Sequence, residues 1–496
     1  MNNLQSLSLY WPELILTVTV LGAIIFDLFL PKEKSRNVGW FVFGGLLLSS
    51  FAIIGQDSQT TTLFMDAIVL DPFGQFFKLL VISATALVII ASQENNELKG
   101  YSQGEYYSLL GILVFGLFLM VSSVDLISVY LSLEVVSIMS FILSGYLKND
   151  QRSNESALKY VIYGAFSSGV MLYGMSLIYG ITGSTNFFEI QNQLVGGSGD
   201  YNLIFVIAIV MILVGFGYKI SMVPFHFWTP DVYEGAPTTI TAFLSVAPKA
   251  GGLALFIRFF HQVLGDGVAL EGNGYLTNTE LPWPQMIAVL AVATMTLGNL
   301  VALQQKSIKR MLAYSSVAHA GYMLMALPVL SSDGIQAIMI YLVMYLLMNL
   351  GAFFVVLYVK NRTGSETFED YSGLGWNMPI LGIVMTIFMV SLTGLPPTAG
   401  FIGKFYIFAS VIKAGSQFYW LAFFGAFNSV VSLYYYFKVV KVMFLDGEKS
   451  ETIEFPNKPI LGLLLVTAIP SLLFGIYWRP VIKWVEYSFH FFTQIL

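Results

Sequence analysis

Long apolar segments with few charges follow one another from end to end of this 496-residue chain. Only 11% of its residues are charged, against about 25% in a typical soluble protein, and 56% are hydrophobic. So few charges cannot cover a surface that faces water, whereas a lipid bilayer favours an apolar surface. The sequence therefore predicts an all-α polytopic membrane protein in contact with lipid, since the apolar runs lack the alternation of barrel strands.

We expect about 14 transmembrane helices, because each crossing needs about 20 apolar residues. The predicted spans lie near residues 11–30, 38–55, 72–92, 106–122, 125–146, 158–181, 202–225, 238–260, 284–303, 311–330, 335–359, 378–411, 417–444 and 459–478.

The basic residues predict the orientation of these spans. If the loop with Lys32 is cytoplasmic, the cytoplasmic side collects 16 of the 24 Lys and Arg residues, and the opposite side collects five. Those five are Lys78, Arg258, Lys413, Arg479 and Lys483. The excess of positive charge on one side supports the orientation and places both termini outside, on the periplasmic face.

Composition excludes several kinds of chemistry. The chain has no cysteine, so it holds no disulfide and no cysteine-ligated iron–sulfur cluster, and its four histidines lack a short metal-binding spacing. There is no basic stripe for nucleic acid and no Walker loop or dinucleotide fingerprint. We therefore expect no cofactor in this chain, and an energy source in an ion gradient or a partner complex.

Three lysines have no loop to occupy: Lys219, Lys249 and Lys404 lie inside apolar segments, together with one acid, Glu134. Each charge costs about 2.5–3.5 kcal/mol at the bilayer centre, so a compensating arrangement must exist. Static ion pairs are one interpretation, and snorkelling is another for Lys219. Three lysines cannot all be neutralised by one acid, which favours groups that gain and lose protons.

Prolines accompany these lysines and predict breaks in the helices. Pro224 follows Lys219, Pro248 precedes Lys249, and Pro396 and Pro397 precede Lys404. A proline removes a backbone hydrogen bond, and broken helices beside charges are typical of ion-transport sites. An ordinary proline kink is the alternative, chiefly at Pro248.

The ionisable residues also recur with a constant offset. A spacing of 185 residues separates Glu134 from His319 and Lys219 from Lys404. This offset corresponds to five spans, and an odd number inverts the second copy in the membrane, as in transporters. Chance is the alternative. We expect a three-helix segment at 1–105, five-helix repeats at 106–262 (spans 4–8) and 283–445 (spans 9–13) with spans 7 and 12 broken, and a C-terminal helix at 446–496.

This chemistry suits proton transfer. A buried amine loses its proton more readily than one in water, and a nearby carboxylate reverses that effect. Glu134 could therefore switch Lys219, and protons could pass on to Lys249, His319 and Lys404. Histidine titrates near neutral pH, which suits a relay. Lys159 and His226 could supply protons from the cytoplasmic side, although His226 is equally an ordinary interfacial histidine.

Three segments resemble a known family. The runs GFGYKISMVPFHFWTPDVYEGAPTTITAFLSVAPKAGG, SIKRMLAYSSVAHAGYML and SLTGLPPTAGFIGKFYIF are similar to the antiporter-like membrane subunits of respiratory complex I, the bacterial NADH-quinone oxidoreductase. The resemblance covers essentially the whole chain. It implies that NAD, FMN, iron–sulfur clusters and quinone bind in other subunits, that other membrane-arm subunits are partners, and that the bacterial inner membrane is the location.

The resemblance also implies roles for single residues. Glu134 matches the membrane glutamate of the family, Lys219 and Lys249 match its lysines of the seventh and eighth spans, His319 matches its central axis, and Lys404 matches its exit residue. Two other functions stay open. One is a subunit of a cation/proton antiporter, and the other is a purely structural membrane subunit whose charges only fix helix register.

Overall fold

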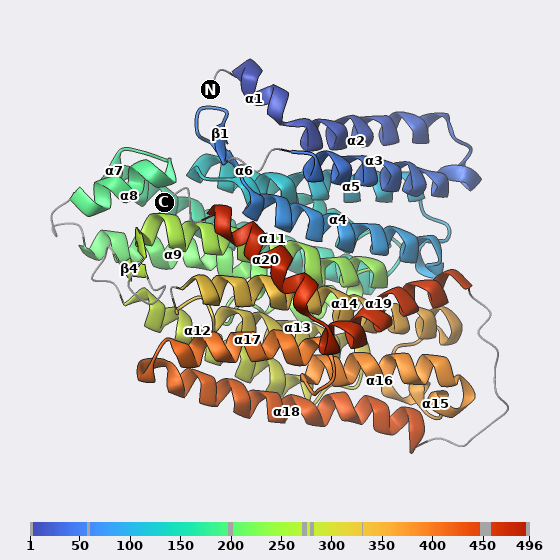
Figure 1. Ribbon diagram of the computed structural model, residues 1–496. Helices are drawn as coiled ribbons and strands as arrows, with labels where there is room; N and C mark the ends of the chain where they lie inside the picture. Colours follow the sequence, from blue (N-terminus) through green and yellow to red (C-terminus); the bar gives the residue numbers. More distant parts are fainter. Residues whose placement is uncertain are drawn as a thin grey trace.

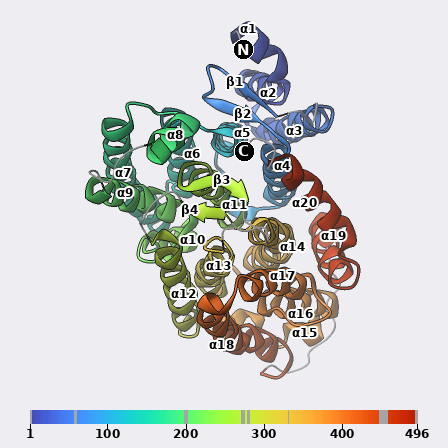
Figure 2. The same cartoon turned by 60° about the vertical axis from the view of Figure 1, so that its left-hand side comes forward.

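The computed structural model describes residues 3–56, 60–196, 202–269, 275–277, 282–329, 331–446 and 458–492. Long helices lie side by side and run roughly parallel and antiparallel (Figure 1). Seen from a second direction, they form one bundle with the N-terminal helices at one end and α12 (Trp283–Ala302) and α18 (Tyr419–Phe444) at the other (Figure 2).

The first half of the chain runs through eleven helices and two short strands. The helices are α1 (Asn3–Leu9), α2 (Trp11–Phe29), α3 (Val38–Ile54), α4 (Pro72–Gln93), α5 (Gln103–Ser122), α6 (Leu126–Ser144), α7 (Gln151–Thr182), α8 (Phe187–Gly196), α9 (Asn202–Ile220), α10 (Trp228–Gly235) and α11 (Thr238–Leu264). The strands β1 (Thr61–Leu63) and β2 (Ile68–Leu70) pair antiparallel.

The second half begins with a second antiparallel pair of strands, β3 (Gly265–Ala269) and β4 (Tyr275–Thr277). Its remaining helices are α13 (Ile308–Leu324), α14 (Ser332–Thr363), α15 (Leu374–Asn377), α16 (Pro379–Thr393), α17 (Ala399–Lys413), α19 (Lys458–Ile476) and α20 (Arg479–Phe492). Short 3-10 turns are η1 (Lys32–Asn37), η2 (Asn96–Leu98), η4 (Phe368–Tyr371) and η5 (Ser416–Phe418).

Local sequence sets where these helices begin and end. Asp125 caps α6 by accepting hydrogen bonds from the N–H groups of Ile127 and Ser128. Such side-chain caps satisfy backbone donors that the first helical turn leaves free. The helix α14 ends at Thr363 and is capped by Gly364, whose φ of 76° suits glycine.

The fold class predicted from the sequence is confirmed, but the number of spans is not. Eleven of the described helices are long and apolar enough to cross a membrane, or twelve if the pair Phe368–Asn377 and Pro379–Thr393, bent by 119°, counts as one span. The helix α13 has 17 residues, and α16 and α17 have 15 each. The count of 14 therefore stays a prediction.

The proposed repeats have similar packing. In the first, α5 packs on α6 and α7 packs on α9; in the second, α12 packs on α13 and α14 packs on α17. The repeat boundaries themselves stay a prediction. The predicted C-terminal region contains two helices, α19 and α20, and both chain ends lie on the same side of the bundle in Figure 1.

Candidate proton relay in the membrane

Two interruptions divide long helices beside buried lysines. The helix α9 ends at Ile220, and the following Ser221 has φ 65° before the chain turns into α10. The helix α16 ends at Thr393, and Gly394 has φ 87° before α17 begins. Pro224, Pro396 and Pro397 lie within these interruptions, so the breaks predicted for the seventh and twelfth spans are present.

The break predicted at Pro248 is wrong. Pro248 lies inside α11, which continues from Thr238 to Leu264 without interruption. Every described residue of this helix is buried among its neighbours. A proline removes only one backbone hydrogen bond of the helix, and tight packing on all sides holds the helix together where that bond is missing.

Lys219 and Glu134 lie near each other at the first interruption. The Lys219 Nζ, in the last turn of α9, donates a hydrogen bond of 3.2 Å to Ser137 Oγ on α6. Glu134 is one turn earlier on α6 and accepts a hydrogen bond from Ser168 of α7. No ion pair joins Glu134 to Lys219 within the described part of the chain, so Ser137 is the direct partner of the lysine.

Lys249 and His319 form the centre of the site. The Lys249 Nζ on α11 donates to the carbonyl oxygen of Ser316 on α13 at 2.9 Å and also to the Ser316 hydroxyl. His319 lies one turn further along α13. Its Nδ1 is 2.5 Å from the Tyr341 hydroxyl of α14, and its Nε2 is 2.9 Å from the Tyr436 hydroxyl of α18.

Lys404 lies on α17, beside the second interruption. Its Nζ donates to the carbonyl oxygen of Thr393 at 2.8 Å and to Ser429 Oγ of α18 at 3.2 Å. The same atom lies 4.3 Å from the ring centroid of Tyr322 on α13, which is cation–π distance. Thr393 is the last residue of α16, so the negative end of that helix dipole faces the amine.

The contacts of Lys219 and Lys404 repeat the 185-residue offset. Lys219 contacts Ser137 on α6, and Lys404 contacts Tyr322 on α13, which is the position equivalent to Ser137 in the second repeat. A contact between two equivalent positions is a stronger sign of a repeat than the recurrence of residue types alone.

The three lysines and His319 are buried, whereas Glu134 is partly exposed, and the three lysines have polar rather than ionic partners. Lys219, Lys249, His319 and Lys404 are at most 5% exposed. The ion pairs found among the described residues include none of these three lysines, which argues against static ion pairs as the reason for their burial. Hydroxyl and carbonyl oxygens can partner an amine in either protonation state.

Sequence reasoning missed these hydroxyl partners. Ser137 is three residues from Glu134, and Ser316 and Tyr322 are each three residues from His319. That spacing places them on the same helical face as the predicted residues, so it could have identified them. Tyr341 and Tyr436 come from other helices and carried no such signal.

The two residues predicted for proton uptake lie in different surroundings. Lys159 of α7 is 2.6 Å from Asp231 of α10 and 2.6 Å from Glu155, and its side chain is 37% exposed. His226 is buried in the segment between α9 and α10. Lys159 thus belongs to an ion-pair network that also contains Arg310, which bonds Asp231 at 2.8 Å.

The predicted positions of two basic residues are wrong. Lys78 and Arg258 were assigned to outer loops, but both are buried inside helices. The Lys78 Nζ lies 2.5 Å from Glu13, and Arg258 forms hydrogen bonds of 2.6 and 2.8 Å with Asp71. Glu134 is therefore not the only acid in these helices, and Lys78 and Arg258 each have an acid that compensates their charge.

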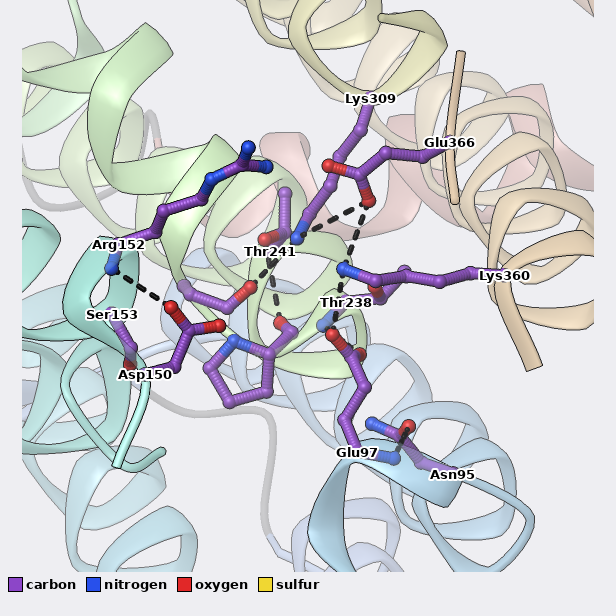
Figure 3. Close-up of polar contacts among 12 residues, drawn as sticks. Asn95, Glu97, Asp150, Arg152, Ser153, Thr238, Thr241, Lys309, Lys360 and Glu366 are labelled. Atoms are coloured by element: carbon purple, nitrogen blue, oxygen red, sulfur yellow. Dashed lines mark hydrogen bonds and ion pairs between the residues drawn. The ribbon is translucent and has the colours of Figure 1, made fainter. Parts of the chain in front are cut away.

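A further cluster of charges lies at the helix ends where α13 begins and α14 terminates. Glu97, Lys309, Lys360 and Glu366 point toward one another there (Figure 3). Among the described residues, no group of three or more His, Cys, Asp or Glu side chains is arranged to hold a metal ion.

The fold and site define a class: a polytopic membrane protein with interrupted helices and a row of buried amines and one imidazole. Residues 123–432 match the family model described as NADH:quinone oxidoreductase/Mrp antiporter, transmembrane. The chain belongs to this family, as the sequence motifs indicated.

Known relatives agree with this assignment. The chain is 43% identical to NADH-quinone oxidoreductase subunit N of Anaeromyxobacter sp. (strain Fw109-5), over 99% of this chain and 98% of the relative. A chain of respiratory complex I from Thermus thermophilus superposes with a TM-score of 0.78 at 29% identity, covering 96% of this chain and 100% of that one. A chain of the Mrp complex from Dietzia sp. DQ12-45-1b shares the fold, with a TM-score of 0.82 at 18% identity over 97% and 98% of the two chains.

Proposed function

We propose that this chain is a proton-translocating membrane subunit of a bacterial NADH-quinone oxidoreductase, equivalent to the subunit N of its relatives. The observation that carries the proposal is the row of buried Lys219, Lys249, His319 and Lys404, each bonded to hydroxyl or carbonyl groups instead of carboxylates. Such groups at membrane depth are expensive and typical of proton pathways.

In this proposal a proton enters from the cytoplasmic side through the region of Lys159 and His226 and reaches Lys219. It then passes to Lys249, His319 and Lys404 and leaves on the periplasmic side. Glu134 controls Lys219, because its charge and position change the free energy of the lysine ammonium. The serine and tyrosine hydroxyls supply hydrogen-bond partners between the amines.

In the proposed complex, other subunits supply the cofactors and the energy source. NAD, FMN, iron–sulfur clusters and quinone bind in other subunits, and electron transfer there drives the protons. The partners are other membrane-arm subunits, including further antiporter-like ones. The chain lies in the bacterial inner membrane with both termini in the periplasm, and its two repeats have inverted orientation.

The test is NADH-driven proton pumping by the purified complex in proteoliposomes. Lys219→Met, Glu134→Gln and Lys404→Met should each lower the number of protons moved per NADH while the complex still assembles. Lys413→Met is the control, because Lys413 lies on α17 like Lys404 but is 62% exposed and pairs with Asp333 at the surface. Wild-type pumping in all three relay variants would favour a purely structural subunit.

A cation/proton antiporter is the second candidate, because the family description names both systems and the Mrp chain shares the fold. Affinity purification from membranes separates the two. Co-purification of NADH-oxidising, quinone-reducing subunits supports the main proposal, whereas co-purification with antiporter subunits alone supports the alternative.

A further inference from the structure

Four side chains of alternating charge form a largely buried group at one end of the bundle, which we call the ion-pair quartet: Glu97, Lys309, Lys360 and Glu366 (Figure 3). The Lys360 Nζ lies 2.8 Å from Glu97 and 3.0 Å from Glu366. The Lys309 Nζ lies 3.9 Å from Glu366. Two positive and two negative charges balance, and Lys309 is fully buried.

The quartet joins elements that are far apart in sequence. Glu97 is on η2 between α4 and α5, Lys309 is in the first turn of α13, Lys360 is in the last turn of α14, and Glu366 follows α14. Glu97 also accepts a 2.8 Å hydrogen bond from the N–H of Thr238, the first residue of α11. The ends of α11, α13 and α14 are thus tied together at one point.

These three helices carry the centre of the proposed relay. Lys249 is on α11, Ser316 and His319 are on α13, and Tyr341 is on α14. The four residues meet only if the three helices keep their relative positions along the bundle axis.

Lys309 adds a second tie between α13 and the start of α11. Its Nζ donates to the carbonyl oxygens of Glu234, at the end of α10, at 3.0 Å and of Ala236, just before α11, at 2.7 Å. Ser316 follows Lys309 by seven residues, or about two helical turns. A slide of α13 along α11 that breaks the bonds of Lys309 would also displace Ser316 from Lys249.

We propose that Glu97, Lys309, Lys360 and Glu366 are positioning residues of the relay, which set the register of α11, α13 and α14 and thereby the contacts of Lys249 and His319. The inference rests on the proposed function. Glu97 in the quartet holds its charge rather than passing protons. Burial alone would raise the pKa of Glu97, but Lys309, Lys360 and the Thr238 N–H lower it to about 2, so this carboxylate stays ionised at neutral pH.

Glu97→Gln tests the role of the quartet. The amide keeps the size of the side chain and an oxygen for the Thr238 N–H, and it removes one charge. In the assembled complex we expect fewer protons per NADH, a loss as large as in Lys249→Met, with electron transfer to quinone retained. Lys360→Arg preserves the charge and should preserve the number of protons moved per NADH.

The matched control is Glu13→Gln. Glu13 on α2 also forms a buried ion pair with a lysine, Lys78 on α4, at 2.5 Å. Neither of these helices carries a relay residue. This variant should lower the thermal stability of the complex and leave the protons per NADH unchanged. An equal loss in Glu97→Gln and Glu13→Gln would mean that any buried charge defect impairs pumping, and it would overturn the inference.

The double variant Glu97→Gln/Lys360→Met separates charge balance from geometry. It restores charge neutrality, so thermal stability and assembly should recover relative to Glu97→Gln. The ion pair between η2 and α14 is still missing, so the number of protons per NADH should stay low. A wild-type number of protons per NADH in the double variant refutes a positioning role. This test applies even if Glu97→Gln alone does not assemble. If Lys219→Met and Lys249→Met also pump normally, the proposed function fails instead.

Discussion

Replacing Gly394 by alanine should displace Lys404 without changing any titratable group. Gly394 has φ 87°, and a Cβ placed there would lie 2.7 Å from the Cδ of Lys404. The left-handed backbone costs a non-glycine residue about 1–2 kcal/mol. The close contact adds the loss of a charge-assisted hydrogen bond, about 1.5–3 kcal/mol, if the Nζ of Lys404 leaves the Thr393 carbonyl.

Gly364→Ala is the matched control. Gly364 also ends a helix with a positive φ of 76°, but a Cβ there meets nothing within 4 Å. Both variants therefore carry the same backbone cost, and only Gly394→Ala moves a relay lysine. Moving Lys404 to relieve the contact gives up its bond to Thr393, so Gly394→Ala should be less stable than Gly364→Ala by about 1.5–3 kcal/mol.

The assay is the number of protons moved per NADH in proteoliposomes, together with the thermal stability of the purified complex. We expect a loss of stability in both variants, larger in Gly394→Ala because the close contact adds to the shared backbone cost, and a loss of pumping in Gly394→Ala alone. Equal pumping in the two variants would show that the position of Lys404 against the end of α16 does not matter for transport.

Three further substitutions test the site. Gly252→Ala should lower pumping, because its Cβ would lie 2.8 Å from Ile220 and 3.4 Å from the Cγ of Lys219; wild-type protons per NADH would contradict this. Tyr436→Phe removes the partner of His319 Nε2 and should slow pumping without loss of assembled complex, as measured by proton flux at fixed NADH oxidation. The pKa of Glu97 is held at about 2, below its ordinary 4.5, so its ion pairs stabilise the complex above about pH 4.5 and lose that effect as the pH falls toward 2. The stability difference between wild type and Glu97→Gln, of the order of 3 kcal/mol, should therefore shrink on acidification.

The helical membrane fold could be predicted because its cause is local. A span needs about 20 apolar residues in a row, and the sequence displays them directly. The interruptions near Lys219 and Lys404 could be predicted for the same reason, since proline acts on its own helix. Pro248 shows the limit of this reasoning, because packing from neighbouring helices decides whether a proline breaks a helix or is accommodated.

The ionisable residues were easier to find than their partners. Lys219, Lys249 and Lys404 stand out because a charge in an apolar segment is rare, whereas Tyr341 and Tyr436 are ordinary residues of membrane helices. Lys78 and Arg258 were misplaced because apolar length does not reveal where a span begins, and their acids, Glu13 and Asp71, lie near predicted helix ends. Pairing across helices is a property of the folded bundle.

The two halves of the relay differ in the group that lies beside the lysine, Lys219 in the first half and Lys404 in the second. Near Lys219 lies the carboxylate of a side chain, Glu134, which accepts a hydrogen bond from a hydroxyl of α7. Lys404 instead meets the Thr393 carbonyl, a partial negative charge fixed by the end of α16. A fixed dipole cannot switch the protonation of Lys404. In the proposed relay, proton transfer is therefore controlled in the first half, at Lys219 and Glu134. The second half can respond only if the interruption at Gly394 moves.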